Sequence, residues 1–184
     1  MSETFLYIAG HPALDFLNTE KANEAGDRVE LLSAPESVMA WMQEANMVEP
    51  PIHDSLLSDA RALRDALRAL VIAWTNDALA PAEPLALLNR VLATGAAQPQ
   101  LTSEFTHRDA LLRATTDPLL PIAESALELL TRHDKALVRK CAGTGCVLWF
   151  LDTTKNKRRR WCRMEACGNR AKVSAHYHRQ REDV

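Results

Sequence analysis

Four cysteines form two pairs of equal spacing near the C-terminal end of the 184-residue chain. Cys141 and Cys146 make the first pair, and Cys162 and Cys167 make the second; the sequence contains no other cysteine. Two short-spaced pairs on separate turns can place four thiolates around one ion, and sulfur ligands with no open position suit a structural zinc. The pattern therefore predicts a Zn²⁺ site, with an iron–sulfur cluster as the less favoured alternative.

Two disulfides are the other interpretation of the four cysteines. The sequence starts MSETFLYIAG, without a basic and then apolar leader, and this favours a reducing cytoplasm, where disulfides are rare. No apolar run approaches the ~20 residues that a membrane-spanning helix needs. We therefore expect a cytoplasmic protein with metal-bound thiolates and without a membrane partner.

The charge of the chain is divided unevenly. Residues 1–138 carry 10 Lys and Arg against 20 Asp and Glu, whereas residues 139–184 carry 12 against 4. This asymmetry predicts two domains with different partners, an acidic one over 1–138 and a basic one over 139–184. The basic domain is too short to bury a sufficient core by itself, so a bound metal is expected to supply part of its stability.

Helical periodicity dominates the acidic domain. Apolar residues recur at three- and four-residue steps over residues 54–79, which predicts a long amphipathic helix. Further helices are predicted over 13–18, 33–45, 81–93, 117–130 and 134–139. Residues 98–115 contain extended-looking runs and predict a β-hairpin. The expected fold class is mainly α with a small β-hairpin, in which a helical N-terminal domain precedes the basic domain.

Polar residues with apolar neighbours are candidates for a ligand site in the acidic domain: His11, Asp15, Asn18 and Arg64. Ordinary turn chemistry is the alternative for the first three, which would then cap and fix the N-terminal turn. Acids on the same helix could likewise pair with Arg64. This domain contains no nucleophile elbow, phosphate-binding glycine loop, HExxH helix or Rossmann pattern, so we expect no enzymatic activity.

The basic domain predicts a hairpin and a helix around the cysteines. Residues 147–152 favour a strand, 153–157 a polar turn, and 158–162 a returning strand. The second cysteine pair leads into a helix-compatible segment over 168–181. A cysteine turn, a hairpin and a helix that begins at cysteines are typical of a treble-clef-like zinc finger.

Basic residues of this domain predict contacts with DNA, because cations that neutralise phosphates release counterions. The candidates are Arg158, Arg159, Arg160, Arg163, Arg170, Lys172, His176 and Arg179. Lys172, His176 and Arg179 would share one helical stripe that could enter a major groove. A solvated basic tail is the alternative. Because one finger covers little DNA, a homodimer is expected.

Two motifs resemble a known family. The sequence Cys167-Gly168-Asn169-Arg170, preceded by Trp161-Cys162, resembles the CGNR zinc-finger family. Residues 10–19, GHPALDFLNT, resemble the opening of the ABATE domain, which precedes this finger in bacterial proteins. The resemblance implies a stress-linked transcription regulator whose finger binds DNA and whose N-terminal domain senses a small ligand. An RNA-binding stress factor and a redox switch that releases zinc on thiolate oxidation are the alternatives.

Overall fold

The computed structural model of the chain describes residues 4–23, 26–47, 53–101, 107–112 and 117–182. It contains two compact units: one is residues 34–128, and the other combines residues 1–33 with 129–184. The division predicted at residue 138 follows the charge of the sequence, whereas these units follow spatial contacts. Within the described ranges, no helix has both the length and the apolar character that crossing a membrane requires.

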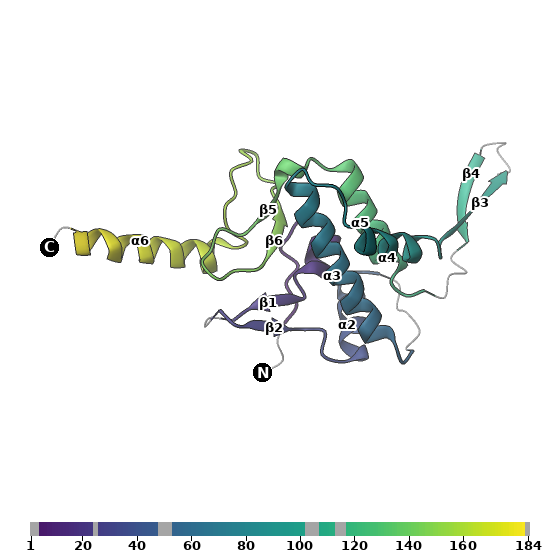
Figure 1. Ribbon diagram of the computed structural model, residues 1–184, viewed down its shortest axis with the longest axis horizontal. Coiled ribbons are helices and arrows are strands. Elements are labelled where there is room, and N and C mark those ends of the chain that lie inside the picture. The colour runs from purple at the N-terminus through teal and green to yellow at the C-terminus, as the bar shows by residue number, and fades with distance from the viewer. Residues whose placement is uncertain (1–3, 24–25, 48–52, 102–106, 113–116, 183–184) are drawn as a thin grey trace. The chain divides into compact units, whose positions relative to one another are not determined.

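Helices form the unit of residues 34–128 (Figure 1). Helix α2 spans Pro35–Glu44, α3 spans Leu56–Thr75, α4 spans Ala82–Leu92 and α5 spans Leu120–Arg132, so that α5 extends past the end of this unit. Helix α3 packs against both α2 and α4. The apolar positions that predicted these helices form the core; the largest buried side chains include Trp41, Met42, Leu56, Leu63, Leu67 and Ile122. The predicted mainly helical fold class is confirmed.

The same unit contains the predicted β-hairpin. Strands β3 (Ala96–Leu101) and β4 (His107–Leu112) pair antiparallel, with Ala96 opposite Leu112. Residues 113–116, which the prediction included, lie outside the described residues.

The other unit begins with α1 (Pro12–Leu17), which confirms the predicted N-terminal helix. Strands β1 (Glu20–Ala22) and β2 (Arg28–Glu30) follow and pair antiparallel. Sequence analysis did not predict this second hairpin, because its strands are short and mostly polar. An ion pair between Arg28 Nη1 and Glu20 Oε1, 2.9 Å apart, joins the strands.

The cysteine-bearing segment completes this unit. A 3₁₀ turn at Lys135–Leu137 takes the place of the helix predicted over 134–139 and leads into β5 (Val138–Lys140). Strand β6 (Trp149–Leu151) pairs antiparallel with β5. A single π-helical turn at Met164–Gly168 precedes helix α6 (Asn169–Glu182), and α6 agrees with the predicted C-terminal helix.

The predicted returning strand over 158–162 is wrong. Strand β6 pairs with the residues before the first cysteine pair, not with those after the polar turn. The reason is the buried carboxylate of Asp152, which accepts hydrogen bonds from the Thr154 and Arg159 amides at 3.1 and 2.8 Å. These bonds fold residues 152–159 into a loop around Asp152.

Candidate metal centre and the surfaces beside it

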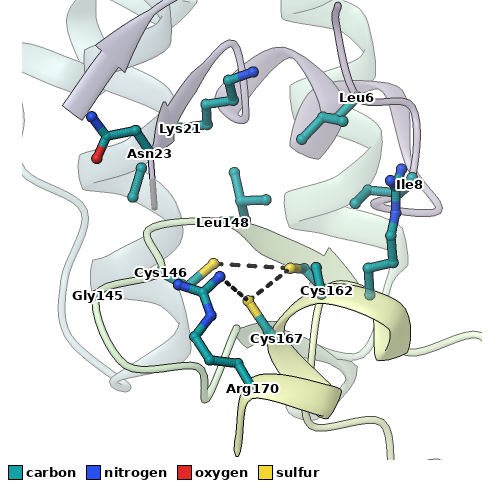
Figure 2. Close-up of a pocket in the computed structure, with 13 residues that line it drawn as sticks. Leu6, Ile8, Lys21, Asn23, Gly145, Cys146, Leu148, Cys162, Cys167 and Arg170 are labelled. Atoms are coloured by element: carbon teal, nitrogen blue, oxygen red, sulfur yellow. Dashed lines mark hydrogen bonds between the residues drawn. The ribbon is translucent and has the colours of Figure 1, made fainter. Parts of the chain in front are cut away.

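The four cysteine sulfurs converge within 4.8 Å of one another. Cys162 Sγ lies 3.9 Å from Cys146 Sγ and 3.7 Å from Cys167 Sγ (Figure 2). Four thiolates placed tetrahedrally at about 2.3 Å from zinc are separated by about 3.8 Å, whereas a disulfide bond measures about 2.05 Å. The observed separations therefore fit a four-coordinate metal ion and are too long for disulfides.

The loop between β5 and β6 positions the first cysteine pair. The Cys141 amide donates to Leu148 O at 2.8 Å, and the Cys146 amide donates to Gly143 O at 3.0 Å, so the chain makes a tight turn between the two thiols. A Cβ atom on Gly143 would lie only 2.8 Å from Cys167 Sγ. This turn consequently needs glycine at residue 143 for steric reasons, because a side chain there would displace Cys167 from the cluster.

The second pair is placed by the turn that starts α6. The Cys162 amide donates to Cys141 Sγ at 3.2 Å, which links the two pairs directly. Cys167 lies in the π-helical turn, and Arg170 Nη2 lies 4.0 Å from its sulfur (Figure 2). A guanidinium beside a thiolate offsets its negative charge, so Arg170 is a supporting group of the metal centre.

Hydrogen bonds between the cysteine thiols shift their pKa values in opposite directions. Hydrogen bonds from the Cys146 and Cys162 thiols hold the pKa of Cys141 well below its usual range, and backbone amides add to this effect. The hydrogen bond that Cys146 makes with Cys141 raises the pKa of Cys146 to about 11, and the hydrogen bond that Cys162 makes with Cys141 raises the pKa of Cys162. Of these three thiols Cys141 therefore ionises first, and a bound metal dication would favour the thiolate form of Cys146 and Cys162.

The N-terminal segment holds the metal-binding loop through β6. The side chain of Asn18 donates to Trp149 O at 2.8 Å and accepts from the Trp149 amide at 2.9 Å. The Leu151 amide donates to Ala9 O at 2.7 Å, while the Ala9 amide donates to Asp15 Oδ1 at 2.8 Å. Both polar residues therefore bond to backbone groups that fix the strand leading out of the first cysteine turn.

Asp15 gives this packing a pH dependence. Burial raises the pKa of Asp15 from 3.8 to about 6, although hydrogen bonds from the Ala9 and Ile8 amides oppose the shift. The folded state therefore binds the proton more tightly than the unfolded state, and the free energy of unfolding falls as pH rises from about 4 to about 6. Asp15→Asn should remove this decline, while its amide oxygen still accepts from Ala9.

Urea unfolding of both proteins at several pH values between about 4.5 and 7 tests this expectation. The relevant quantity is the difference in unfolding free energy between wild type and Asp15→Asn, because protons linked to the cysteines then cancel. A difference that stays constant across this range would refute the role of Asp15.

The remaining candidate ligand residues are divided between the two units. His11 caps α1, since its Nδ1 accepts from the Ala13 amide at 3.3 Å, and its ring meets the ring of His133 edge-on with centroids 5.0 Å apart. Arg64 is buried in the other unit, with Nε 3.8 Å from Asp65 Oδ1. His11, Asp15 and Asn18 thus make structural hydrogen bonds in one unit, and Arg64 belongs to the other.

Arg159 has a structural role that sequence analysis did not predict. Its guanidinium donates to Trp161 O at 3.1 Å, to Ile8 O at 3.0 Å and to Cys162 O. It also lies over the ring of Phe150, 4.2 Å from the centroid. The side chain thereby joins the N-terminal segment to the second cysteine turn.

Asp152 is the second structural residue that sequence analysis missed. It is fully buried, and desolvation raises its pKa, but hydrogen bonds from Thr154 and Arg159 and the charge of Arg139 together hold the pKa below its usual value. Arg139 Nη1 lies 3.5 Å from Asp152 Oδ2. A threonine two residues after an aspartate is a turn signal, and the pair Asp152 and Thr154 could have identified this turn from the sequence.

Four of the predicted DNA-binding arginines line one open groove of about 560 Å³, in which Glu165 is the acidic residue: Arg158, Arg159, Arg160 and Arg163. Arg158, Arg160 and Arg163 are exposed, whereas Arg159 is half-buried, and Arg160 lies over the ring of Trp161 at 5.1 Å from its centroid. Arg170 and Lys172 are exposed near the start of α6. His176 and Arg179 belong to the same helix by their backbone, but their side chains lie outside the described ones.

Two family models match the chain. The ABATE model, described as "Putative stress-induced transcription regulator", matches residues 10–133. The CGNR zinc-finger model matches residues 138–180, a range that contains all four cysteines and both strands of the β5–β6 hairpin. A comparison with curated proteins gives no match. The two matches have the order and the positions that the sequence motifs indicate.

Proposed function

We propose that this chain, which belongs to the ABATE family and carries a C-terminal CGNR zinc finger, is a transcription regulator that binds duplex DNA through its finger. The observation that carries the proposal is the open groove lined by Arg158, Arg160 and Arg163, directly beside the second cysteine pair. Exposed guanidinium groups in one groove suit the closely spaced phosphates of a DNA backbone.

The metal of the finger is zinc in this proposal. Four sulfur donors with separations close to those of a tetrahedron support this assignment. Bound zinc would neutralise thiolate charge and fix the two cysteine turns together. A site with four protein ligands leaves no position for a substrate, so the metal has a structural role and we propose a regulator rather than an enzyme.

Removal of two groove charges is expected to weaken DNA binding and flatten its salt dependence. Each phosphate contact contributes about 0.9 to the slope of log K against log salt concentration. The double variant Arg158→Gln with Arg160→Gln should therefore lower the slope by about 2. Fluorescence anisotropy of zinc-loaded protein with random-sequence duplex DNA, over a series of salt concentrations, measures both quantities.

The matched control is Arg90→Gln with Arg132→Gln, which removes two exposed arginines at the ends of α4 and α5. This control should bind DNA like the wild type. Equal slopes for the groove variant and the wild type would contradict the proposal. A parallel titration with single-stranded RNA at one salt concentration distinguishes the RNA-binding alternative, which a clear RNA preference would favour. The homodimer stays a prediction from contact area.

We further propose that the segment before the finger responds to a small molecule. Its support is a cavity that lies between the N-terminal segment and the metal centre, within one compact unit.

A further inference from the structure

A cavity of about 140 Å³ lies between strand β1 and the cysteine cluster, within one compact unit (Figure 2). Three of the four cysteines line it: Cys146, Cys162 and Cys167. Cys141 does not, so the cavity borders one face of the cluster. A small molecule in this cavity would therefore meet sulfur atoms. The lining does not include the predicted ligand residues His11, Asp15, Asn18 and Arg64.

The charges around the cavity favour an uncharged molecule. Zinc with four thiolates has a net charge of about −2, and the two arginines that line the cavity, Arg163 and Arg170, balance it. Lys21 also lines the cavity but already has an interaction partner. An ion would thus lack a counter-charge beside the apolar part of the wall, which consists of Leu6, Ile8, Ala22, Leu148 and Ala166. A water molecule needs roughly 10–15 Å³ of such cavity volume, so the cavity has room for about ten non-hydrogen atoms.

The sulfurs that line the cavity are placed for oxidation. Cys146 is half-buried, whereas the other three cysteines are buried, so Cys146 is the sulfur that a molecule in the cavity reaches most readily. Thiolates attack peroxides, and the resulting sulfenic acid condenses with a second thiol to a disulfide. Cys162 Sγ, 3.9 Å from Cys146 Sγ, is such a second sulfur in the same cavity. An alkylating electrophile would need one sulfur only, whereas this arrangement provides the pair that a peroxide uses.

We propose that the cavity admits an organic hydroperoxide with an apolar body, which oxidises Cys146 and Cys162 to a disulfide. The Cys146 thiolate attacks the terminal peroxide oxygen: an S–O bond forms, the O–O bond breaks, and the leaving alkoxide takes a proton from solvent to become an alcohol. The Cys162 thiolate then attacks the oxidised sulfur, so that an S–S bond forms and hydroxide leaves, which a second proton converts to water. The two sulfurs lose two electrons in total, and the peroxide gains them.

Oxidation would disassemble the metal centre. The disulfide removes two of the four sulfur donors, and the two that remain cannot hold a structural zinc. Arg163 directly follows Cys162 and lines the arginine groove, so loss of the metal should displace it and weaken DNA binding. This last step rests on the proposed function, whereas the oxidation does not. The inference deepens the proposed small-molecule response by naming its site and the class of molecule.

Zinc release from the zinc-loaded full chain tests the inference without DNA. A chromogenic chelator follows the release after addition of cumene hydroperoxide or hydrogen peroxide. Each rate is divided by the rate of the same oxidant with glutathione, which corrects for intrinsic reactivity. The apolar body of cumene hydroperoxide can pack against the cavity wall, so its normalised rate should exceed that of hydrogen peroxide at least about tenfold. Equal normalised rates, or no release by cumene hydroperoxide, would overturn the inference.

Peptide mass spectrometry identifies the disulfide. Trypsin places Cys146 in a peptide of residues 141–155 and Cys162 in one of residues 161–163. Oxidation should link these two peptides, with fragment ions that assign the bond to Cys146. A disulfide that excludes Cys146 would contradict the proposed attack from the cavity.

Two variants test whether the oxidant enters through the cavity. Ala22→Leu keeps every sulfur and charge but fills cavity volume, so it should slow cumene hydroperoxide at least about tenfold while hydrogen peroxide reacts at the wild-type rate. Ala136→Leu adds the same volume at an exposed position outside the cavity and should react like the wild type. A wild-type rate with cumene hydroperoxide in zinc-loaded Ala22→Leu would refute the location. Should Ala22→Leu fail to retain zinc, the comparison of the two oxidants on the wild type still decides. Because these measurements contain no DNA, their failure leaves the DNA result unaffected.

Discussion

Zinc removal is expected to unfold residues 138–168 while helices α2, α3 and α4 stay folded. The hydrophobic core of the cysteine-bearing segment is small, and its two cysteine turns meet at the four sulfurs and at the hydrogen bond from the Ala142 amide to Arg160 O. Structural zinc contributes about 10–16 kcal/mol of apparent binding free energy at neutral pH, more than so small a segment gains from packing. The helices have a separate buried core, in the unit of residues 34–128.

Elemental analysis and amide NMR measure this effect. The purified protein should contain one zinc per chain, and a chelator should collapse the amide resonances of residues 138–168 into the random-coil range. Those of α2 to α4 should stay dispersed. Dispersed resonances for the cysteine turns in zinc-free protein would contradict a metal-dependent fold.

Two variants distinguish a metal ligand, Cys167, from a neighbouring group that supports it, Arg170. Arg170 contacts Cys167 Sγ without being a ligand, and loss of such a supporting group typically costs about 10- to 100-fold in metal affinity. Arg170→Gln should fall in this range, whereas Cys167→Ser removes a soft sulfur donor and should weaken zinc binding by more than 100-fold. Equal zinc affinity of Cys167→Ser and wild type would exclude Cys167 from the site.

The features that sequence analysis predicted correctly depend on local spacing. The helices of residues 34–128 follow from apolar residues at three- and four-residue steps, and the convergence of Cys141, Cys146, Cys162 and Cys167 follows from two equal pairs. In both cases the residues that carry the pattern are close in sequence. Each pattern is therefore contained in one continuous segment of the sequence.

The features that it missed depend on contacts between distant residues. Asn18 bonds to Trp149, 131 positions later, and no periodicity connects the two. Arg159 appears in the sequence as the middle of three arginines, which suggests a uniformly exposed basic run. Its bonds to Ile8 O and Trp161 O show that one member of the run turns inward. Local composition cannot distinguish such a residue from its neighbours.

The loop after β6 illustrates the same limit. Residues 158–162 have the composition of a strand, but a strand needs a partner edge, and both edges of β6 are occupied: β5 pairs with one, and Ala9 and Asn18 bond to the other. Asp152, through its burial and hydrogen bonds, fixes the residues after β6 in a loop instead. Turn chemistry at one aspartate thus outweighed the strand propensity of the residues that follow.

Replacement of Asn18 is expected to destabilise the metal-binding unit although Asn18 is no metal ligand. Its buried side chain satisfies both the amide and the carbonyl of Trp149, a residue of β6 three positions after Cys146. Asn18→Ala leaves two buried backbone groups without partners, and each such group costs about 1–3 kcal/mol. The free energy of unfolding should therefore fall by about 2–6 kcal/mol.

Asn18→Asp tests the hydrogen bond that the Asn18 side chain donates to Trp149 O. The carboxylate can still accept from the Trp149 amide, but an oxygen replaces the Nδ2 donor that lies 2.8 Å from Trp149 O. The new carboxylate oxygen and Trp149 O are both acceptors, so they repel each other. The substitution also buries a charged group where the amide was neutral. This near-isosteric change should therefore destabilise the protein at least as much as Asn18→Ala. Retention of wild-type stability by Asn18→Asp would show that the pairing with Trp149 contributes little.

Three measurements connect this destabilisation to the metal. Urea unfolding gives the free energy, hydrogen exchange of the Trp149 amide reports the local opening, and a chromogenic chelator follows zinc release. All three should change in Asn18→Ala, because β6 leads directly out of the first cysteine turn. Asn76→Ala is the control: Asn76 caps α3 in the other unit with an exposed bond to Ile72 O, so zinc release should stay at the wild-type rate. Equally slow zinc release from Asn18→Ala would mean that the N-terminal segment packs on the finger without stabilising its metal.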